Sequence, residues 1–110
     1  MMSVLVVDDD DLVLKSLNRV LKLNGYDVTL AESGKVALEE VDKREFDIVL
    51  SDIRMPLMDG LETLDRIDGK AKKRLLMTGY SEAYHSRDLK VPCLLKPFGI
   101  DELLNHLKGN

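Results

Sequence analysis

Residues 46–60, FDIVLSDIRMPLMDG, constrain more than any other stretch what this chain can fold into. The apolar run at residues 48–50 is typical of a strand that is buried on both faces of a parallel sheet. This strand runs into Asp52, and Pro56 then removes a backbone donor and disfavours helical geometry at the residue before it. An Asp-Gly pair closes the stretch as a turn that tolerates a positive φ. The pattern therefore places a carboxylate at the end of a central strand, where open α/β sheets bind their ligands.

The rest of the chain alternates strand patterns with helix patterns. Short apolar runs predict further strands at residues 3–8, 27–31, 75–77 and 91–95. Apolar residues at helical spacing predict helices over residues 11–23, about 36–41, 61–67 and 100–107. Residues 81–87 could form one more helix, capped by Ser81, although they lack a clear apolar stripe. This alternation predicts an α/β fold with right-handed βαβ units, in which the carboxyl ends of all strands lie at one edge of the sheet.

Several local signals refine this expectation. Pro92 cannot donate to a neighbouring strand, so the strand that contains it is predicted at the edge of the sheet. The Asn-Gly pair at residues 24–25 predicts a left-handed helix stop, and the last helix is expected to begin near Asp101 or Gly99. The basic run at residues 70–74 is expected to form a solvated loop that leads into the fourth strand.

Length and charge limit the class of protein. The 110 residues fit one domain, residues 1–110, with one hydrophobic core and no output domain after the last helix. The net charge of −4 argues against direct binding to nucleic acid. No apolar run is long enough to span a bilayer and the start lacks the basic residues of a secretion signal, so a cytoplasmic protein is expected. Cys93 has no partner thiol and is predicted to pack in a buried strand.

Polar residues end four of the predicted strands. They are Asp8 and Asp9, Asp52, Thr78 and Lys96. Two carboxylates about 4 Å apart repel by roughly 4 kcal/mol at an effective dielectric constant near 20, so a cluster of three requires a compensating cation. Lys96 supplies one positive charge, and the remaining hard, all-oxygen environment fits Mg²⁺ held by two carboxylates, a backbone carbonyl and water.

A site neutralised in this way would allow Asp52 to act as a nucleophile on phosphorus. Carboxylates form covalent intermediates with phosphoryl groups, and catalysis of phosphoryl transfer consists mainly of positioning and charge neutralisation. Thr78 would donate its hydroxyl to a phosphoryl oxygen, Lys96 would pair with another oxygen, and Gly79 would leave space for the incoming group. Asp10 and Asp11 are expected only to cap the following helix and to interact with its dipole.

Four motifs give the sequence a resemblance to a known family. They are residues 6–9 (VVDD), 50–60 (LSDIRMPLMDG), 77–79 (MTG) and 96–98 (KPF). Together they resemble, in the same order, the signatures of the receiver domain of bacterial two-component response regulators. The resemblance implies a flavodoxin-like, doubly wound, five-stranded parallel sheet of order 2-1-3-4-5 with helices on both faces.

The resemblance also implies functional roles. Asp52 would be phosphorylated by a sensor histidine kinase or a phosphotransfer protein. Asp9 would bind Mg²⁺ directly, Asp8 through water, and the backbone carbonyl of Arg54 would complete the protein ligands. Arg54 and Tyr80 occupy positions at which family members tune the access of water to the phosphoryl group.

One position departs from the family pattern. In the family, phosphorylation draws the threonine towards the phosphoryl group, and an aromatic residue three positions before the lysine turns inward. This changes the face formed by the fourth helix, fifth strand and fifth helix. Here that position is Cys93, so Tyr80 or Tyr84 would have to take the role of the aromatic residue. The short connections on either side of Thr78 predict trimmed third and fourth helices.

Three rival functions were weighed. A phosphatase with an aspartyl nucleophile needs a second acid two residues after the first, but Arg54 occupies that place. A flavin mononucleotide module would place its phosphate beside the four consecutive aspartates, residues 8–11, which would repel it. The third rival, a receiver-like interaction module that works without phosphorylation, remains open. In either case the partner could be a downstream protein or an output domain outside this sequence.

Overall fold

A computed structural model describes residues 1–81 and 89–108 of the chain. Its strands are β1 (Ser3–Val7), β2 (Asp27–Ala31), β3 (Phe46–Asp52), β4 (Ala71–Thr78) and β5 (Cys93–Leu95). Its helices are α1 (Asp11–Leu23), α2 (Gly34–Lys43), α3 (Gly60–Ile67) and α5 (Ile100–Leu107). The helix expected over residues 81–87 lies almost entirely outside the described residues. In the described part of the chain, no helix is both long enough and apolar enough to cross a membrane.

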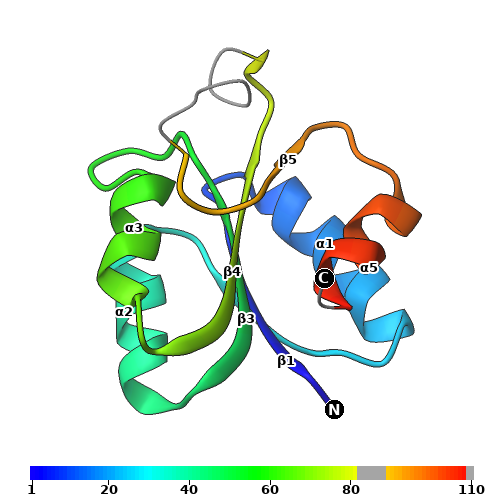
Figure 1. Ribbon diagram of the computed structural model, residues 1–110, viewed down its shortest axis with the longest axis horizontal. Helices are drawn as coiled ribbons and strands as arrows, with labels where there is room; N and C mark the ends of the chain where they lie inside the picture. The colour runs from blue at the N-terminus through cyan, green and yellow to red at the C-terminus, as the bar shows by residue number, and fades with distance from the viewer. Residues whose placement is uncertain (82–88, 109–110) are drawn as a thin grey trace.

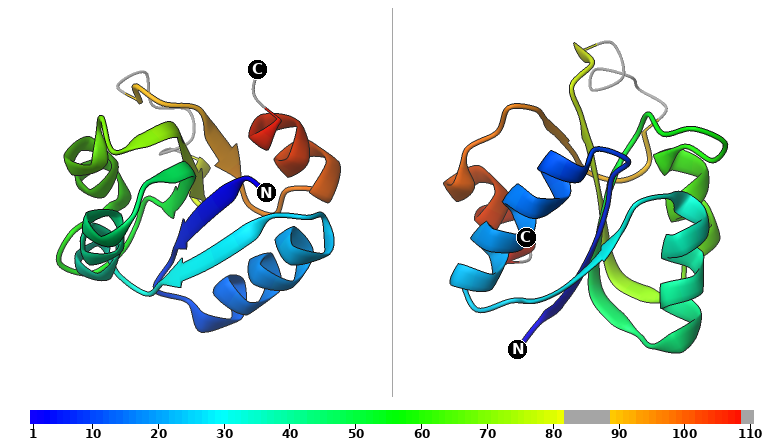
Figure 2. Two further views of the ribbon diagram at one scale, coloured as in Figure 1. Left: turned by 90° about the horizontal axis from the view of Figure 1, so that it is seen from below. Right: turned by 180° about the vertical axis from the view of Figure 1, so that it is seen from behind.

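The five strands form one parallel sheet in the order β2-β1-β3-β4-β5, which confirms the predicted flavodoxin-like topology. The pairs α1 with α5 and α2 with α3 cover opposite faces of this sheet (Figures 1 and 2). β3 lies at the centre, and β2 and β5 form the edges, as predicted.

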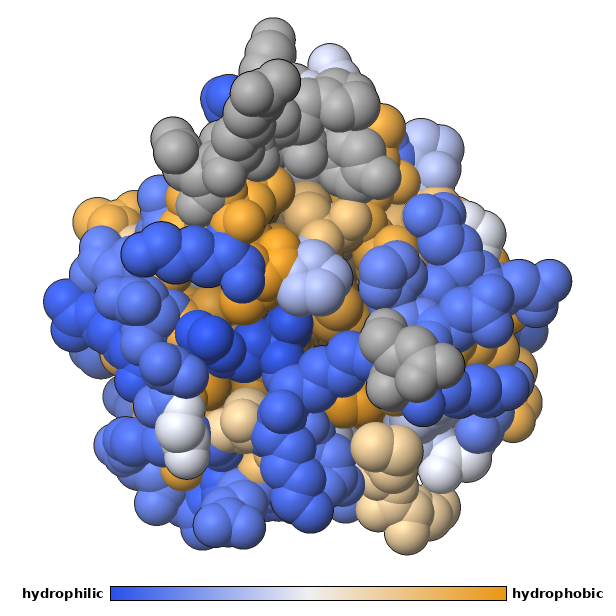
Figure 3. Space-filling model, in the orientation of Figure 1, coloured by the Kyte–Doolittle hydropathy of each residue, from blue (hydrophilic) through white to orange (hydrophobic). Residues whose placement is uncertain are grey.

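Alternating side chains explain why the central strands are apolar on both faces. In β1, Val4 and Val6 pack in a core with α1 and α5, whereas Leu5 and Val7 pack in a second core with α2 and α3. β3 alternates in the same way over residues 48–50, with Ile48 and Leu50 in the first core and Val49 in the second. Seen from the β5 side of the sheet, apolar surface shows in the upper middle of the molecule, with hydrophilic surface on both sides and below it (Figure 3).

The structure confirms several local predictions. Asp10 caps α1, because its side chain accepts a hydrogen bond from the backbone N–H of Leu12 at 3.0 Å. Gly25 follows α1 with a φ of 88°, as expected for a left-handed helix stop. Gly99, one of the two expected positions, is the N-cap of α5.

Two predictions about loops were wrong. The basic run at residues 70–74 is not a solvated loop, because β4 begins at Ala71 and contains most of the run. The turn expected at Asp59-Gly60, a pair that tolerates a positive φ, lies earlier in the chain, where Leu57 has a φ of 70°. Gly60 starts α3, and the side chain of Asp59 caps this helix by accepting a hydrogen bond from Glu62 N–H at 2.8 Å.

β5 is also shorter than predicted. It starts at Cys93 instead of residue 91, although the carbonyl of Pro92 still accepts a hydrogen bond from Leu76 N–H in β4 at 2.9 Å. Proline can accept but cannot donate, so it lies just outside the regular ladder.

Candidate functional site

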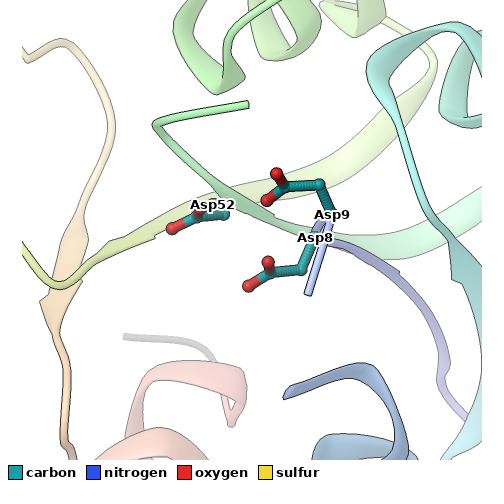
Figure 4. A group of neighbouring side chains, drawn as sticks. All are labelled: Asp8, Asp9 and Asp52. Carbon is teal, nitrogen blue, oxygen red and sulfur yellow. The ribbon is translucent and has the colours of Figure 1, made fainter. Parts of the chain in front are cut away.

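Three carboxylates converge at the carboxyl ends of the two neighbouring strands β1 and β3. Asp52 is the last residue of β3, and Asp8 follows β1 directly. Asp8 and Asp52 are buried, whereas Asp9 is exposed. One oxygen from each of the three carboxylates lies within 4.8 Å of the others (Figure 4). The structure thus brings together the acids that the sequence had placed at different strand ends.

Lys96, just after β5, supplies the positive charge of this cluster. Its Nζ lies 2.9 Å from Asp8 Oδ2 and 3.1 Å from Asp52 Oδ1. The other oxygen of Asp8 accepts a hydrogen bond from the backbone N–H of Asp10 at 2.9 Å. Both oxygens of Asp8 therefore have protein donors, which leaves the exposed Asp9 as the more accessible carboxylate of the pair.

This environment changes the proton affinity of both Asp52 and Lys96. Burial raises the pKa of Asp52, and the negative charge of Asp8 raises it further, while Lys96 acts in the opposite direction. Burial alone would lower the pKa of Lys96, but its hydrogen bond to Asp8 and the charge of Asp52 outweigh burial and raise it. Lys96 consequently stays cationic at neutral pH, while the charge of Asp52 is only partly compensated.

Thr78 lies at the end of the next strand, β4. Its side chain is fully buried, and its hydroxyl oxygen accepts a hydrogen bond from Tyr80 N–H at 3.1 Å. Its carbonyl accepts a hydrogen bond from the backbone N–H of Lys96 at 2.7 Å, which joins the ends of β4 and β5. Thr78 directly follows Met77, which pairs with Asp52 across the sheet. Its hydroxyl keeps its own proton available for a bound group.

Gly60 allows the loop after Asp52 to fold back onto the strand end. A Cβ atom at Gly60 would lie 2.0 Å from the backbone oxygen of Asp52, a distance that no side chain can occupy. The N–H of Gly60 also donates to the carbonyl of Ile53 at 2.7 Å. Asp52 itself is held further by the Ser51 hydroxyl, which donates to the Asp52 carbonyl at 2.9 Å. Sequence reasoning missed these contacts, although a glycine after a turn is compatible with a close approach of two backbone segments.

The side chains of Arg54 and Tyr80 stack on each other. The guanidinium carbon lies 3.9 Å from the centre of the tyrosine ring, within the range of a cation–π interaction. Arg54 follows Asp52 by two residues and Tyr80 follows Thr78 by two residues, so the stack joins two loops at the edge of the sheet that carries the site. The sequence had singled out both positions but gave no sign that the two side chains touch.

Cys93 does not take part in the acidic cluster. Burial, together with the charge of Asp52, raises the pKa of its thiol to about 11, so the thiol is neutral at physiological pH. It packs against the core on the α2 and α3 face, as the sequence predicted. Tyr84, one of the two suggested substitutes for the missing aromatic residue, lies outside the described residues.

The family model of the response regulator receiver domain matches residues 4–108. The chain therefore belongs to the receiver-domain family of two-component response regulators, as the four motifs indicated.

Particular relatives agree with this assignment. The transcriptional regulatory protein ZraR of Escherichia coli O157:H7 is 43% identical over an alignment of 106 positions that covers 91% of this chain and 24% of that protein. Response regulator MprA of Mycobacterium leprae is 38% identical over an alignment of 114 positions that covers 98% of this chain and 50% of that protein. The chain thus spans between a quarter and a half of the length of these relatives.

Solved structures show the same fold. Response regulator TrrA from Thermotoga maritima, in complex with Mg²⁺-BeF, superposes with a TM-score of 0.87 at 35% identity and covers 98% of this chain and 97% of its own. The chemotaxis response regulator CheY4 of Vibrio cholerae has a TM-score of 0.82 at 28% identity, with coverage of 98% and 97%.

Proposed function

We propose that this receiver domain, spanning residues 1–110, accepts a phosphoryl group on Asp52 from a sensor histidine kinase or a phosphotransfer protein. The observation that carries the proposal is the position of the Asp52 carboxylate, which contacts Lys96 at the end of the central strand and lies beside two further carboxylates. A carboxylate in this setting can be neutralised for attack on phosphorus and is reached from the open edge of the sheet.

Mg²⁺ is the proposed cofactor of this site. The donors are carboxylate oxygens that lie close together, which suits a hard divalent cation and not a soft one. Asp9 and Asp52 would bind the ion directly, Asp8 through water, and the Arg54 carbonyl would complete the protein ligands. Bound Mg²⁺ would offset the negative charge of the phosphoryl oxygens. The relative TrrA, which was solved with Mg²⁺-BeF, supports this choice of metal.

The chain's own residues divide the transfer among them. An oxygen of Asp52 forms a bond to phosphorus while the bond from phosphorus to the donor's leaving group breaks, and the leaving group departs with the bonding electrons. Lys96 pairs with one phosphoryl oxygen and Thr78 donates its hydroxyl to another. The chain in this way assists its own phosphorylation and later hydrolysis, without acting as an enzyme on a separate substrate.

The phosphorylated domain would change its interaction surface and so signal to a downstream protein or to an output domain. Thr78 is the side chain best placed to respond to a phosphoryl group on Asp52. Its backbone carbonyl accepts a hydrogen bond from Lys96 N–H, and its hydroxyl accepts one from Tyr80 N–H. Cys93 occupies the usual aromatic position, so we propose that Tyr80 supplies the aromatic response instead.

The experiment that tests this function is the intact mass of the protein after incubation with acetyl phosphate, with and without Mg²⁺. The wild type is expected to gain one phosphoryl group only when Mg²⁺ is present. Asp52→Asn is expected to gain none, because an amide is a poor nucleophile. Asp11→Asn serves as the matched control, because Asp11 is an exposed acid of α1 whose carboxylate pairs with Lys15 and not with the site.

Two outcomes would contradict the proposal. Full labelling of Asp52→Asn would show that the acceptor is a different residue. No labelling of the wild type would favour the receiver-like interaction module that works without phosphorylation.

A further inference from the structure

The first half of β4 carries three basic residues, and two neighbours among them, Lys73 and Arg74, point to opposite faces of the sheet. Lys73 pairs with Ile48 of β3, which belongs to the core under α1 and α5. Arg74 pairs with Val49, which belongs to the core under α2 and α3. Side chains of successive strand residues alternate between faces, so each cation is directed at a different helix layer. Figures 1 and 2 show β4 between α3 on one side and α5 on the other.

Lys73 reaches the C-terminal end of α5. Its Nζ donates a hydrogen bond to the backbone carbonyl of His106, in the last turn of that helix. The last carbonyls of a helix lack donors within the helix and carry the negative end of its dipole. A lysine ammonium satisfies both needs at once, and Lys73 is half-buried, so this bond is shielded from water more than a surface contact would be.

Arg74 does the same for α3. Its Nη1 donates to the carbonyl of Leu64 at 2.7 Å, and its Nη2 lies 3.4 Å from the carboxylate of Asp68. The N–H of Asp68 bonds to Asp65 instead of to Leu64. In a regular helix, the Leu64 carbonyl would accept a hydrogen bond from the N–H four residues later, that of Asp68. Here that N–H bonds elsewhere, and the Arg74 guanidinium donates to the Leu64 carbonyl in its place.

The two helices depend on these contacts to different extents. α5 has only 8 residues, buries only Leu103 and Leu107, and begins at Gly99 without a side-chain cap. α3 is equally long, but it buries four residues, and the side chain of its N-cap residue Asp59 accepts a hydrogen bond from Glu62 N–H. A helix of this length does not form alone in water, so it depends on its anchoring to the rest of the fold. Among the described helices, α5 has the weakest attachment at its start.

We propose that Lys73 anchors the C-terminal end of α5 to β4, and that Arg74 anchors α3 in the same way from the opposite face of the strand. Loss of the Lys73 ammonium releases α5 as a local unit, while the sheet and α3 remain folded. β4 ends at Thr78, so the strand that closes the candidate site is also the strand that holds two helices. The anchoring is independent of the proposed function, because it exists in the unphosphorylated protein.

Amide hydrogen exchange of the unphosphorylated protein tests this proposal residue by residue. Lys73→Met keeps the aliphatic stem and removes the donor, and exchange in α5 is expected to quicken about fivefold or more, the factor for one lost hydrogen bond. Exchange in α3 should stay at the wild-type rate. Arg74→Met is the matched control: exchange in α3 should quicken, and exchange in α5 should stay at the wild-type rate. Lys73→Arg keeps a cationic donor and should retain most of the α5 protection.

Amides of β3 give the reference for global unfolding. The proposal is overturned if Lys73→Met leaves α5 unchanged, or if it quickens α3, α5 and β3 by the same factor, since that would be a general loss of stability. Should Lys73→Met fail to fold, Lys73→Gln provides the comparison, because it removes the positive charge that interacts with the C-terminal end of α5 and has a shorter side chain. With this variant too, α5 must exchange faster than in the wild type while α3 does not.

Discussion

Ionisation of Asp52 lowers the stability of the folded protein. Its pKa is raised in the folded protein, so between the ordinary value of 3.8 and the raised value the folded state binds more protons than the unfolded state. The free energy of unfolding therefore falls as pH rises through this range, and the loss persists at neutral pH. The side chain that the proposed chemistry requires is thus one that weakens the fold.

Asp52→Asn is accordingly expected to raise the melting temperature of the metal-free protein at pH 7. A gain of ~1 kcal/mol would appear as roughly 4–8 °C in a domain of this size. The gain should shrink as the pH falls through the raised pKa of Asp52, because the wild-type carboxyl then takes up a proton. Thermal unfolding followed by circular dichroism between pH 4 and pH 8 measures it.

Asp47 provides a control, because its pKa is shifted in the opposite direction and its charge is expected to stabilise the fold. A backbone hydrogen bond from Ser3, with the help of Lys72, holds the pKa of Asp47 below its usual value. Its stabilising contribution is present above the ordinary pKa and is lost as pH falls through the lowered one. Asp47→Asn should therefore destabilise the protein at pH 7. A melting temperature for Asp52→Asn that is lower than that of the wild type would refute the charge argument.

The stacked pair Arg54 and Tyr80 leads to a second prediction for single residues. If the stack limits the access of water, Arg54→Ala should shorten the lifetime of the phosphoryl group roughly two- to fivefold, in line with a cation–π energy of about 0.5–1 kcal/mol. Tyr80→Phe keeps the ring and should change little, whereas Tyr80→Ala should match Arg54→Ala. Loss of phosphoryl-protein mass over time gives the rates. Equal lifetimes for all four proteins would exclude the stack from this role.

At the scale of the elements, the β3–α3 loop packs on the strand end, and Gly60 is the described glycine at which an added Cβ would meet the closest atom. Gly60→Ala would drive a Cβ into the Asp52 backbone, so we expect a loss of about 2–3 kcal/mol or more and a displaced carboxylate. Urea denaturation measures the loss. Gly79→Ala is the control, because no heavy atom lies within 4 Å of the position its Cβ would take. Equal stability of the two variants would contradict the close approach seen here.

The sequence predicted elements well where apolar periodicity set them and poorly where tertiary contacts did. The strands β1 and β3 and the helix α1 follow from their apolar residues alone. β4 was cut short because Lys72, Lys73 and Arg74 look like a solvated run, yet each has a partner in another element: Asp47 of β3, His106 of α5 and Leu64 of α3. A lysine that bonds to a helix carbonyl or to a carboxylate of another element cannot be recognised from the residues next to it, because the contact forms only when the chain folds.

At the scale of the whole molecule, metal binding should report the folded state. Mg²⁺ that binds only the native site stabilises it by about 2.7 kcal/mol at 100 times its dissociation constant. We expect the melting temperature to rise with Mg²⁺ and to rise less for Asp9→Asn, since Asp9 is the exposed carboxylate of the cluster. Asp10→Asn, beside it but engaged in capping α1, is the control. An unchanged response of Asp9→Asn would remove Asp9 from the proposed ligands.

The candidate site could be predicted from the sequence because the topology brings strand ends together without any need for side-chain detail. Once the order of the parallel strands was inferred, Asp8, Asp52 and Lys96 had to share one edge. The side-chain contacts could not be predicted, because they depend on rotamers and on the paths of loops. Two examples are the ion pairs of Lys96 with both Asp8 and Asp52 and the stacking of Arg54 on Tyr80.

The ammonium that bridges Asp8 and Asp52 lies near the opposite end of the chain from the first carboxylates. During synthesis on the ribosome, a nascent chain that has emerged only through β4 already carries all three acids but no Lys96. Its sheet would have to close over mutually repelling charges with only protons or dissolved cations to offset them. Translation therefore delivers the internal counter-ion after the charges it balances, and free Mg²⁺ should matter most to folding in the interval before residue 96 appears.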